Sequence, residues 1–177
     1  MFSNISRTFL FFSLSRGCLL ILLLFSLSSN TLSAQDSKRD SLLKLVNQSK
    51  ILQNKNSKDT LYIHNLTMLA AEYRFHNLDS LLSLSKESLS ISKKTDYLNG
   101  IIRSYSNIGG YYSDIGKIDE AISYFKKAYE LSCQHNNLHL KVSALNDLAK
   151  EYGYKGDYAF SLKRYLEAIE IAEELNF

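Results

Sequence analysis

The sequence predicts an all-α protein made of stacked antiparallel helix hairpins, and three observations predict it. From Asp40 onward, apolar residues recur at spacings of three and four, and no stretch alternates as a strand would. The breaks between the apolar stripes are short and polar, and two of them contain Gly116 and Gly156, which can adopt positive φ between helices. The same unit returns after about forty residues.

The first 34 residues differ from the rest of the chain. Arg7 and Arg16 are their only charges, and the mostly apolar run 17–27 follows. A basic flank, a short apolar core and a small residue before the cut are typical of a secretory signal peptide, which we predict for residues 1–34 with cleavage after Ala34. The run is shorter than the ~20 residues that span a bilayer, although an uncleaved anchor stays open as an alternative.

Removal of this leader changes the charge and the cysteine count. The chain has 21 Lys and Arg against 18 Asp and Glu, and without Arg7 and Arg16 the balance becomes 19 − 18 = +1. Nucleic-acid binding demands a concentrated positive field, so we predict no nucleic-acid partner. Cys133 would remain as the lone cysteine, and the fold must hold itself by packing.

The repeated unit divides the rest of the chain. We predict an N-terminal helix and linker over residues 35–58, and three repeats over 59–97, 98–137 and 138–177. A shift of forty residues aligns the first helices of the last two repeats, with Tyr105, Ile108, Gly109 and Tyr112 on Leu145, Leu148, Ala149 and Tyr152. It also aligns the second helices, with Ala121, Phe125 and Ala128 on Ser161, Tyr165 and Ala168.

The small residues of this pattern have a packing role. Gly109 and Ala121 let the two helices of a hairpin approach at the short end of ~8–10 Å. Tyr112 and Phe125 then fill the space on either side, and Ala128 leaves room for the first helix of the next unit. The sequence therefore predicts that each hairpin covers its neighbour.

The set Tyr105, Ile108, Gly109, Tyr112, Ala121, Phe125 and Ala128 resembles the signature of the tetratricopeptide repeat, with Cys133 in place of the usual closing proline. The resemblance implies a right-handed α-solenoid that binds a protein or peptide without catalysis or cofactor. It also implies a concave groove lined by the first helix of each repeat. The candidate groove residues are His64, Thr67, Arg74, Arg103, Ser106, Asn107, Asn146 and Lys150. Because Arg74, Arg103 and Lys150 are among them, the expected ligand is an extended peptide of acidic character.

A second, more specific resemblance concerns the order of the leader and the repeats along the chain. A leader followed by long repeats rich in Asn, Lys, Ser and Tyr is similar to the exported front region of bacterial signalling regulators with a histidine kinase or DNA-binding output. This implies a periplasmic or extracytoplasmic sensor or scaffold. The last helix also keeps an apolar stripe, where solenoids usually end in a polar helix. We therefore expect either a longer protein or a homodimer formed through this helix. The stripe comprises Leu162, Tyr165, Leu166, Ile169 and Ala172.

Two patterns are candidate sites of chemistry. The spacing Ser-x-x-Lys places a nucleophile beside an amine in one class of hydrolases, but four copies on amphipathic helices favour coincidence. These copies are Ser41/Lys44, Ser83/Lys86, Ser90/Lys93 and Ser123/Lys126. Cys133, His135 and His139 lie close enough in sequence to meet a zinc ion, but no fourth ligand is evident. We predict no catalytic residue and no metal.

Overall fold

The structure, a computed structural model, describes residues 36–51 and 60–175. Within these ranges the regular structure consists of seven helices and contains no strand, as an all-α solenoid requires. The predicted signal peptide and most of the predicted linker lie outside the described residues. The predicted domain and repeat boundaries stay a prediction.

The helices after the first are of nearly uniform length. The first covers residues 36–51, and α2 is the shortest of the rest. The others are α2 (Thr60–Tyr73), α3 (Leu78–Lys94), α4 (Leu98–Asp114), α5 (Ile118–Gln134), α6 (Leu138–Tyr154) and α7 (Tyr158–Glu174). The helices α2 to α7 belong to one compact unit, which begins at residue 42. No helix in the described ranges combines the length and the apolar character that crossing a bilayer demands.

The turns that follow α3, α4, α5 and α6 share one backbone hydrogen bond, in which an N–H donates to the carbonyl five residues earlier. At the end of α4, the backbone N–H of Lys117 donates to the carbonyl of Tyr112, and the N–H of Gly116 donates to Ser113. This is the Schellman arrangement, which needs a residue at positive φ. Gly116 and Gly156 supply it after α4 and α6, as expected, and Asp96 and Asn136 supply it after α3 and α5.

Side chains cap the starts of three helices. Asn77 accepts a hydrogen bond from the N–H of Ser80, and Asp157 accepts one from Phe160. Short side chains with an oxygen acceptor favour such positions at a helix start. Asn137 caps α6 in the same way through the N–H of Leu140. The positions at which these helices begin and end are therefore set by residues close in sequence, independently of tertiary packing.

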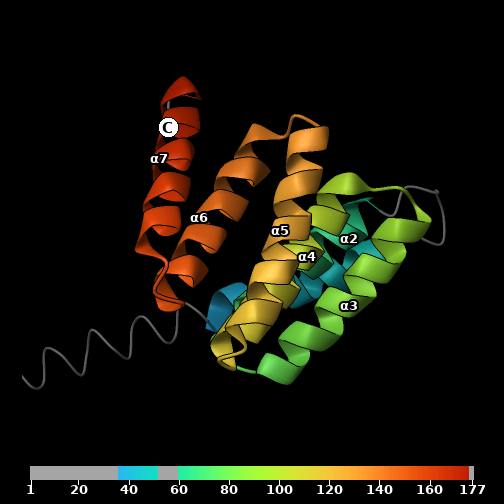
Figure 1. The fold of residues 1–177 in the computed structure, drawn as a ribbon. Coiled ribbons are helices and arrows are strands. Elements are labelled where there is room, and N and C mark those ends of the chain that lie inside the picture. Colours follow the sequence, from blue (N-terminus) through green and yellow to red (C-terminus); the bar gives the residue numbers. More distant parts are fainter. Residues whose placement is uncertain (1–35, 52–59, 176–177) are drawn as a thin grey trace, which may run out of the picture. The chain divides into compact units, whose positions relative to one another are not determined.

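Consecutive helices pack side by side in a row (Figure 1). In addition, α2 contacts α4 and α4 contacts α6, so the first helices of successive hairpins form one continuous surface. This arrangement confirms the predicted solenoid of stacked antiparallel hairpins. It also means that a groove on this surface takes side chains from three hairpins at once.

The packing around Gly109 differs in detail from the expectation. The side chain over Gly109 is the ring of Phe125, and a Cβ added to Gly109 would lie 2.7 Å from this ring. Ala121 packs beside Phe125 in the same buried cluster, against Leu148 of α6. The glycine thus makes room for the aromatic ring of the facing helix.

Ala128 lies against the next hairpin, where it contacts Leu140 and Ala144 of α6. The other residues of the predicted packing set are placed as follows: Ile108, Leu148, Ala149 and Ala168 are buried, and Tyr105, Tyr112 and Tyr152 are half-buried.

Tyr165 corrects one expectation. We predicted a core position for it, because it aligns with Phe125. Phe125 is 1% exposed, but Tyr165 is 40% exposed. Among the described residues no helix follows α7, so the outer side of the Tyr165 ring has nothing to pack against.

Candidate functional site

The surface formed by α2, α4 and α6 contains a groove of about 110 Å³. Four of the predicted groove residues line it together with apolar side chains. The lining consists of Thr67, Met68, Ala71, Arg103, Ser106, Asn107, Leu140 and Ser143. These residues come from all three helices, so stacking of the hairpins creates the groove.

Arg103 is the cation of this groove. It is half-buried on α4, and it forms no ion pair with any part of the chain that the structure describes. A guanidinium presents several donors in a fixed fork that matches a carboxylate or a phosphate. Arg103 is therefore available to an anionic group that enters the groove.

Arg74 is not available in this way, although the sequence placed it in the groove. Its Nε and Nη2 donate to the two carboxylate oxygens of Asp114, each at 2.6 Å. This bidentate pair raises the pKa of Arg74 and ties α2 to α4. The guanidinium also lies over Gly110, where a Cβ would come within 3.1 Å of Nη1.

Lys150 is also engaged with a carboxylate. Its Nζ lies 3.5 Å from Oε1 of Glu151, a fully buried carboxylate that also accepts a hydrogen bond of 2.6 Å from Ser113 Oγ. The other oxygen, Oε2, has no hydrogen-bond partner among the described residues. Lys150 therefore offsets part of the cost of burying Glu151.

Asp147 lies on α6 near the same charges. Burial raises the pKa of its carboxyl group to about 7, because the ionised form loses hydration. The cations Arg74 and Lys150 lower this pKa and Glu151 raises it, but burial is the largest influence. Asp147 thus changes its charge near neutral pH, one helical turn beyond the groove residue Ser143.

The remaining predicted groove residues divide into two groups. Asn107 lines the groove, but its amide donates a hydrogen bond of 2.9 Å to the carbonyl of Thr67. Thr67 is buried, and its hydroxyl donates to the carbonyl of His64. His64 and Asn146 are exposed and lie outside the lining. The structure therefore gathers Thr67, Arg103, Ser106 and Asn107 around one groove, and it places the others beside it.

Sequence reasoning missed four residues of this region. Met68 and Leu140 line the groove, and Asp114 and Glu151 neutralise two of the expected cations. One available signal was the spacing of forty residues between Arg74 and Asp114, which is within one residue of the shift that aligns α2 with α4. Residues one repeat apart lie on adjacent first helices, so opposite charges at this spacing indicate an ion pair.

The two candidate sites of chemistry are placed differently. Ser83, Lys86, Ser123 and Lys126 lie on exposed helix faces, as do Ser90 and Lys93. None of these pairs is enclosed in a cleft, which a serine nucleophile with an oxyanion site requires. Cys133, His135 and His139 are exposed. Within residues 36–51 and 60–175, no group of three or more His, Cys, Asp or Glu is placed to hold a metal ion.

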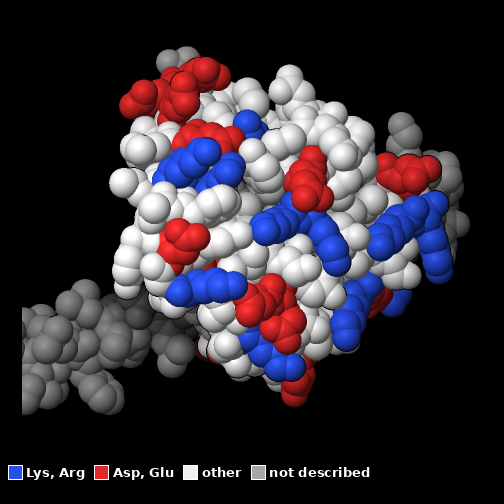
Figure 2. Space-filling view, viewed as in Figure 1, with Lys and Arg blue, Asp and Glu red and all other residues white. Residues whose placement is uncertain are grey.

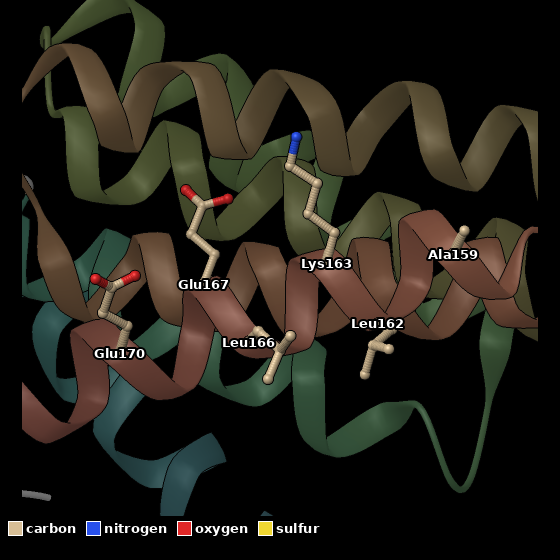
Figure 3. A pocket seen from close by; sticks show the side chains of 6 residues that line it. All are labelled: Ala159, Leu162, Lys163, Leu166, Glu167 and Glu170. Carbon is tan, nitrogen blue, oxygen red and sulfur yellow. The ribbon is translucent and has the colours of Figure 1, made fainter.

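A second surface stands out on α7. A shallow hollow of about 510 Å³ lies along its outer side, lined by residues of this helix (Figure 3). Leu162 and Leu166 are exposed here, as are Tyr158 and Ile169 on the same stripe. The apolar stripe predicted for the last helix is therefore solvent-exposed.

Charges on the face shown in Figure 2 are mixed. Lys and Arg side chains alternate with Asp and Glu over the helices, and no single-sign field forms on the described part of this side of the molecule. In the described part of the chain, two ion pairs join neighbouring repeats, Arg74 with Asp114 and Lys155 with Asp119, each at 2.6 Å. Such pairs join equivalent turns of successive hairpins.

Comparison with known proteins agrees with this geometry. Residues 61–134 match the family model for the tetratricopeptide repeat. This match covers less than half of the chain. Outer dynein arm-docking complex subunit 4 of Danio rerio is 31% identical over 124 residues, which is 70% of this chain but 22% of that protein. The chain thus spans less than a quarter of the length of this relative.

A solved structure shows the same fold. BtubC (BKLC) from P. vanneervenii has a TM-score of 0.67 to this chain at 17% identity, covering 81% of this chain and 59% of the other. Tetratricopeptide repeats mediate protein binding and are generally not enzymes. The match therefore supports a protein-interaction role for residues 61–134.

Proposed function

We propose that the groove formed by α2, α4 and α6 binds an extended segment of a partner protein, and that an anionic group of this segment contacts Arg103. The observation that carries the proposal is the position of Arg103, a cation in a groove without an ion pair in the described chain. The other two expected cations, Arg74 and Lys150, are paired with Asp114 and Glu151. The bound segment therefore needs an anionic group at one position only, opposite Arg103.

The experiment places a photo-reactive amino acid at Ser143, an exposed residue of the groove lining. A matched position is Ser123, which is exposed on α5 outside the groove. We expect a cross-linked partner from Ser143 and not from Ser123, and we expect Arg103→Glu to abolish it. Capture that survives Arg103→Glu would show that the groove assignment is wrong.

We further propose that the protein that contains this groove is an extracytoplasmic sensor or scaffold. It is supported by the predicted signal peptide and by the resemblance to exported repeats that precede a histidine kinase or a DNA-binding domain. Sequencing of the N-terminus of the protein isolated from its own cells tests export, with Gln35 as the expected first residue. An N-terminus at Met1 on a protein in the cytosolic fraction would contradict it.

Self-association through α7 is a second candidate function. It is favoured by the exposed apolar stripe, because monomeric proteins rarely expose large contiguous apolar patches. Light scattering of the purified protein over a range of concentrations tests it. We expect the average mass to rise toward that of a dimer as the concentration increases.

A further inference from the structure

We propose that two copies of this chain pair through α7 in an antiparallel, twofold-symmetric arrangement, in which Lys163 of each copy faces Glu170 of the other. The inference rests on the self-association proposed above and adds its geometry. Its basis is the set of contacts around α7, the distribution of apolar residues on the helix, and two charges that have no partner in the described chain.

The exposed side of α7 corresponds to a covered side of α5. Ile122 of α5 is 6% exposed, and it packs in one cluster with Leu148 of α6. Leu162, the residue aligned with Ile122 in the next repeat, is 59% exposed. On α5, the surface that includes Ile122 is covered by α6. The equivalent surface of α7, which includes Leu162, could therefore bind a helix in the same way.

The exposed residues of α7 follow the spacing of a helix–helix seam. Leu162, Leu166 and Ile169 are separated by four and three residues, which is the spacing of core positions in a paired helix. Tyr158 and Tyr165 extend the same stripe on one flank. A second helix laid along α7 would cover all five side chains.

The other flank of the stripe carries two charges. Lys163 and Glu170 both border the hollow along α7 and both are exposed (Figure 3). Neither forms an ion pair with another described residue. Seven residues separate them, so they lie two turns and about 10.5 Å apart on the same side and cannot pair with each other. Each is available to a second molecule.

Glu167, between them, is different. Its carboxylate accepts a hydrogen bond of 3.0 Å from Tyr129, and it lies 3.3 Å from Lys141 Nζ and 2.7 Å from Arg164 Nη1. These contacts use Glu167 to hold α7 against α5 and α6. Of the three charges that border the hollow, one cation and one anion are therefore left for an outside partner, and they lie symmetrically about the 166–167 peptide bond.

This symmetric placement favours a second copy of the chain as the partner, with its α7 antiparallel to the first. A twofold axis that lies between the two helices, at the level of the 166–167 peptide bond, brings Lys163 opposite Glu170 of a second copy, and the same contact occurs twice because the interface is isologous. The apolar stripes of the two helices then meet around Leu166. In a parallel pair the same flank would instead face the flank that carries Tyr158 and Tyr165, which has no opposite charge.

The size of the surface sets the expected strength. Two helices of 17 residues offer less than the ~800 Å² per partner of a standard interface. We therefore expect a reversible dimer whose mass depends on concentration in the micromolar range, which sedimentation equilibrium of the purified protein measures.

The decisive test is a charge exchange. Lys163→Glu alone and Glu170→Lys alone each place like charges opposite one another twice, and each should weaken the dimer roughly tenfold. An equimolar mixture of the two variants should dimerise again, because every contact in the mixed dimer joins opposite charges. The double variant K163E/E170K should dimerise like the original protein. Lys86→Glu, an exposed change on α3, is the matched control and should have no effect.

The outcomes are separable. A protein that stays monomeric at every concentration would overturn self-association, and it would leave a further helix of a longer chain as the cover for α7. A dimer that is insensitive to all charge changes would overturn the antiparallel pairing while leaving self-association in place. Neither result bears on groove binding, because Ser143 and Arg103 report on that surface alone. Circular dichroism of each variant verifies that the helices remain folded.

Discussion

The second helices of the last two hairpins, α5 and α7, are equal in length and similar in pattern, yet they meet different surroundings. Each has 17 residues, and a shift of forty residues aligns the apolar positions of one with those of the other. α5 lies between α4 and α6, whereas α7 packs mainly on α6 and contacts α5 through Tyr129. The same pattern therefore yields a buried helix in one place and a half-exposed helix in the other.

The repeat pattern gives each second helix two apolar faces, and only one of these faces packs against the first helix of the same hairpin. On α7, Ala168 and Ile171 are buried against α6, and Ser161 donates a hydrogen bond of 2.7 Å to the carbonyl of Ala149. In α5, the opposite face packs against α6, the first helix of the next hairpin. On α7 this face is exposed in the described part of the chain.

The largest expected effect separates Phe125 from Tyr165. Phe125→Ala removes a ring that is fully buried over Gly109, and we expect it to lower the free energy of unfolding by about 3–5 kcal/mol. Tyr165→Ala, at the aligned position, should cost less than about 1 kcal/mol in the monomer, because its ring is already solvated. Urea unfolding at low protein concentration measures both. Equal losses would refute the comparison.

The second prediction concerns two glycines on first helices. Gly109→Ala places a Cβ 2.7 Å from the buried Phe125 ring, and we expect a loss of roughly 1–3 kcal/mol from this clash. Gly153→Ala places a Cβ at an ordinary 3.4 Å from Ser161 Oγ, so it should gain about 0.5–1 kcal/mol from helix propensity. Thermal unfolding of the two variants should shift in opposite directions, and a shared direction would show that the ring does not fix the helix spacing.

The third prediction concerns α6, the helix that α5 and α7 share. Burial raises the pKa of Asp147 to about 7, above its ordinary value of 3.8. The folded state therefore holds a proton that the unfolded state releases, and stability from this group decreases as pH rises from about 4 to about 7.

Between pH 5 and pH 8 we expect the original protein to lose roughly 1–3 kcal/mol relative to Asp147→Asn, which cannot ionise. Urea unfolding of both proteins at the two pH values measures this difference. Parallel pH profiles for the two would contradict the assignment.

The smallest effect comes from the helix starts. Asp157 caps α7, but Lys117 at the start of α5 makes no side-chain cap bond. Asp157→Ala should cost about 1 kcal/mol, and Lys117→Asp should gain up to about 1 kcal/mol by adding the missing cap and complementing the helix dipole. Thermal melts detect both changes. A destabilising Lys117→Asp would show that the cap geometry of α5 cannot accept a side chain.

Much of the fold could be predicted from local sequence signals. The helix ends at Gly116 and Gly156 follow from positive φ, the caps at Asn77 and Asp157 follow from short polar side chains, and the hairpin order follows from the repeat. These features depend on residues within a few positions of one another. The sequence therefore carries them directly.

The candidate groove was predicted less completely. Its location on the first helices followed from the resemblance to the repeat family, and Thr67, Arg103, Ser106 and Asn107 do line one groove. The expected set of three cations reduced to one, because Asp114 lies against Arg74 and Glu151 lies beside Lys150. Ion pairing depends on which side chains of adjacent helices meet, and periodicity alone does not contain that information.

By itself the sequence determined the helices, their turns and the order in which the hairpins stack, since backbone conformation, capping and apolar spacing act over short distances. Only the tertiary structure decided which copies of a repeated residue are buried and which are exposed. Ile122 and Leu162 occupy the same place in the pattern, and their environments differ because a further helix covers one of them. Burial is a property of the neighbours in space, and those neighbours are set by the position of a repeat within the stack.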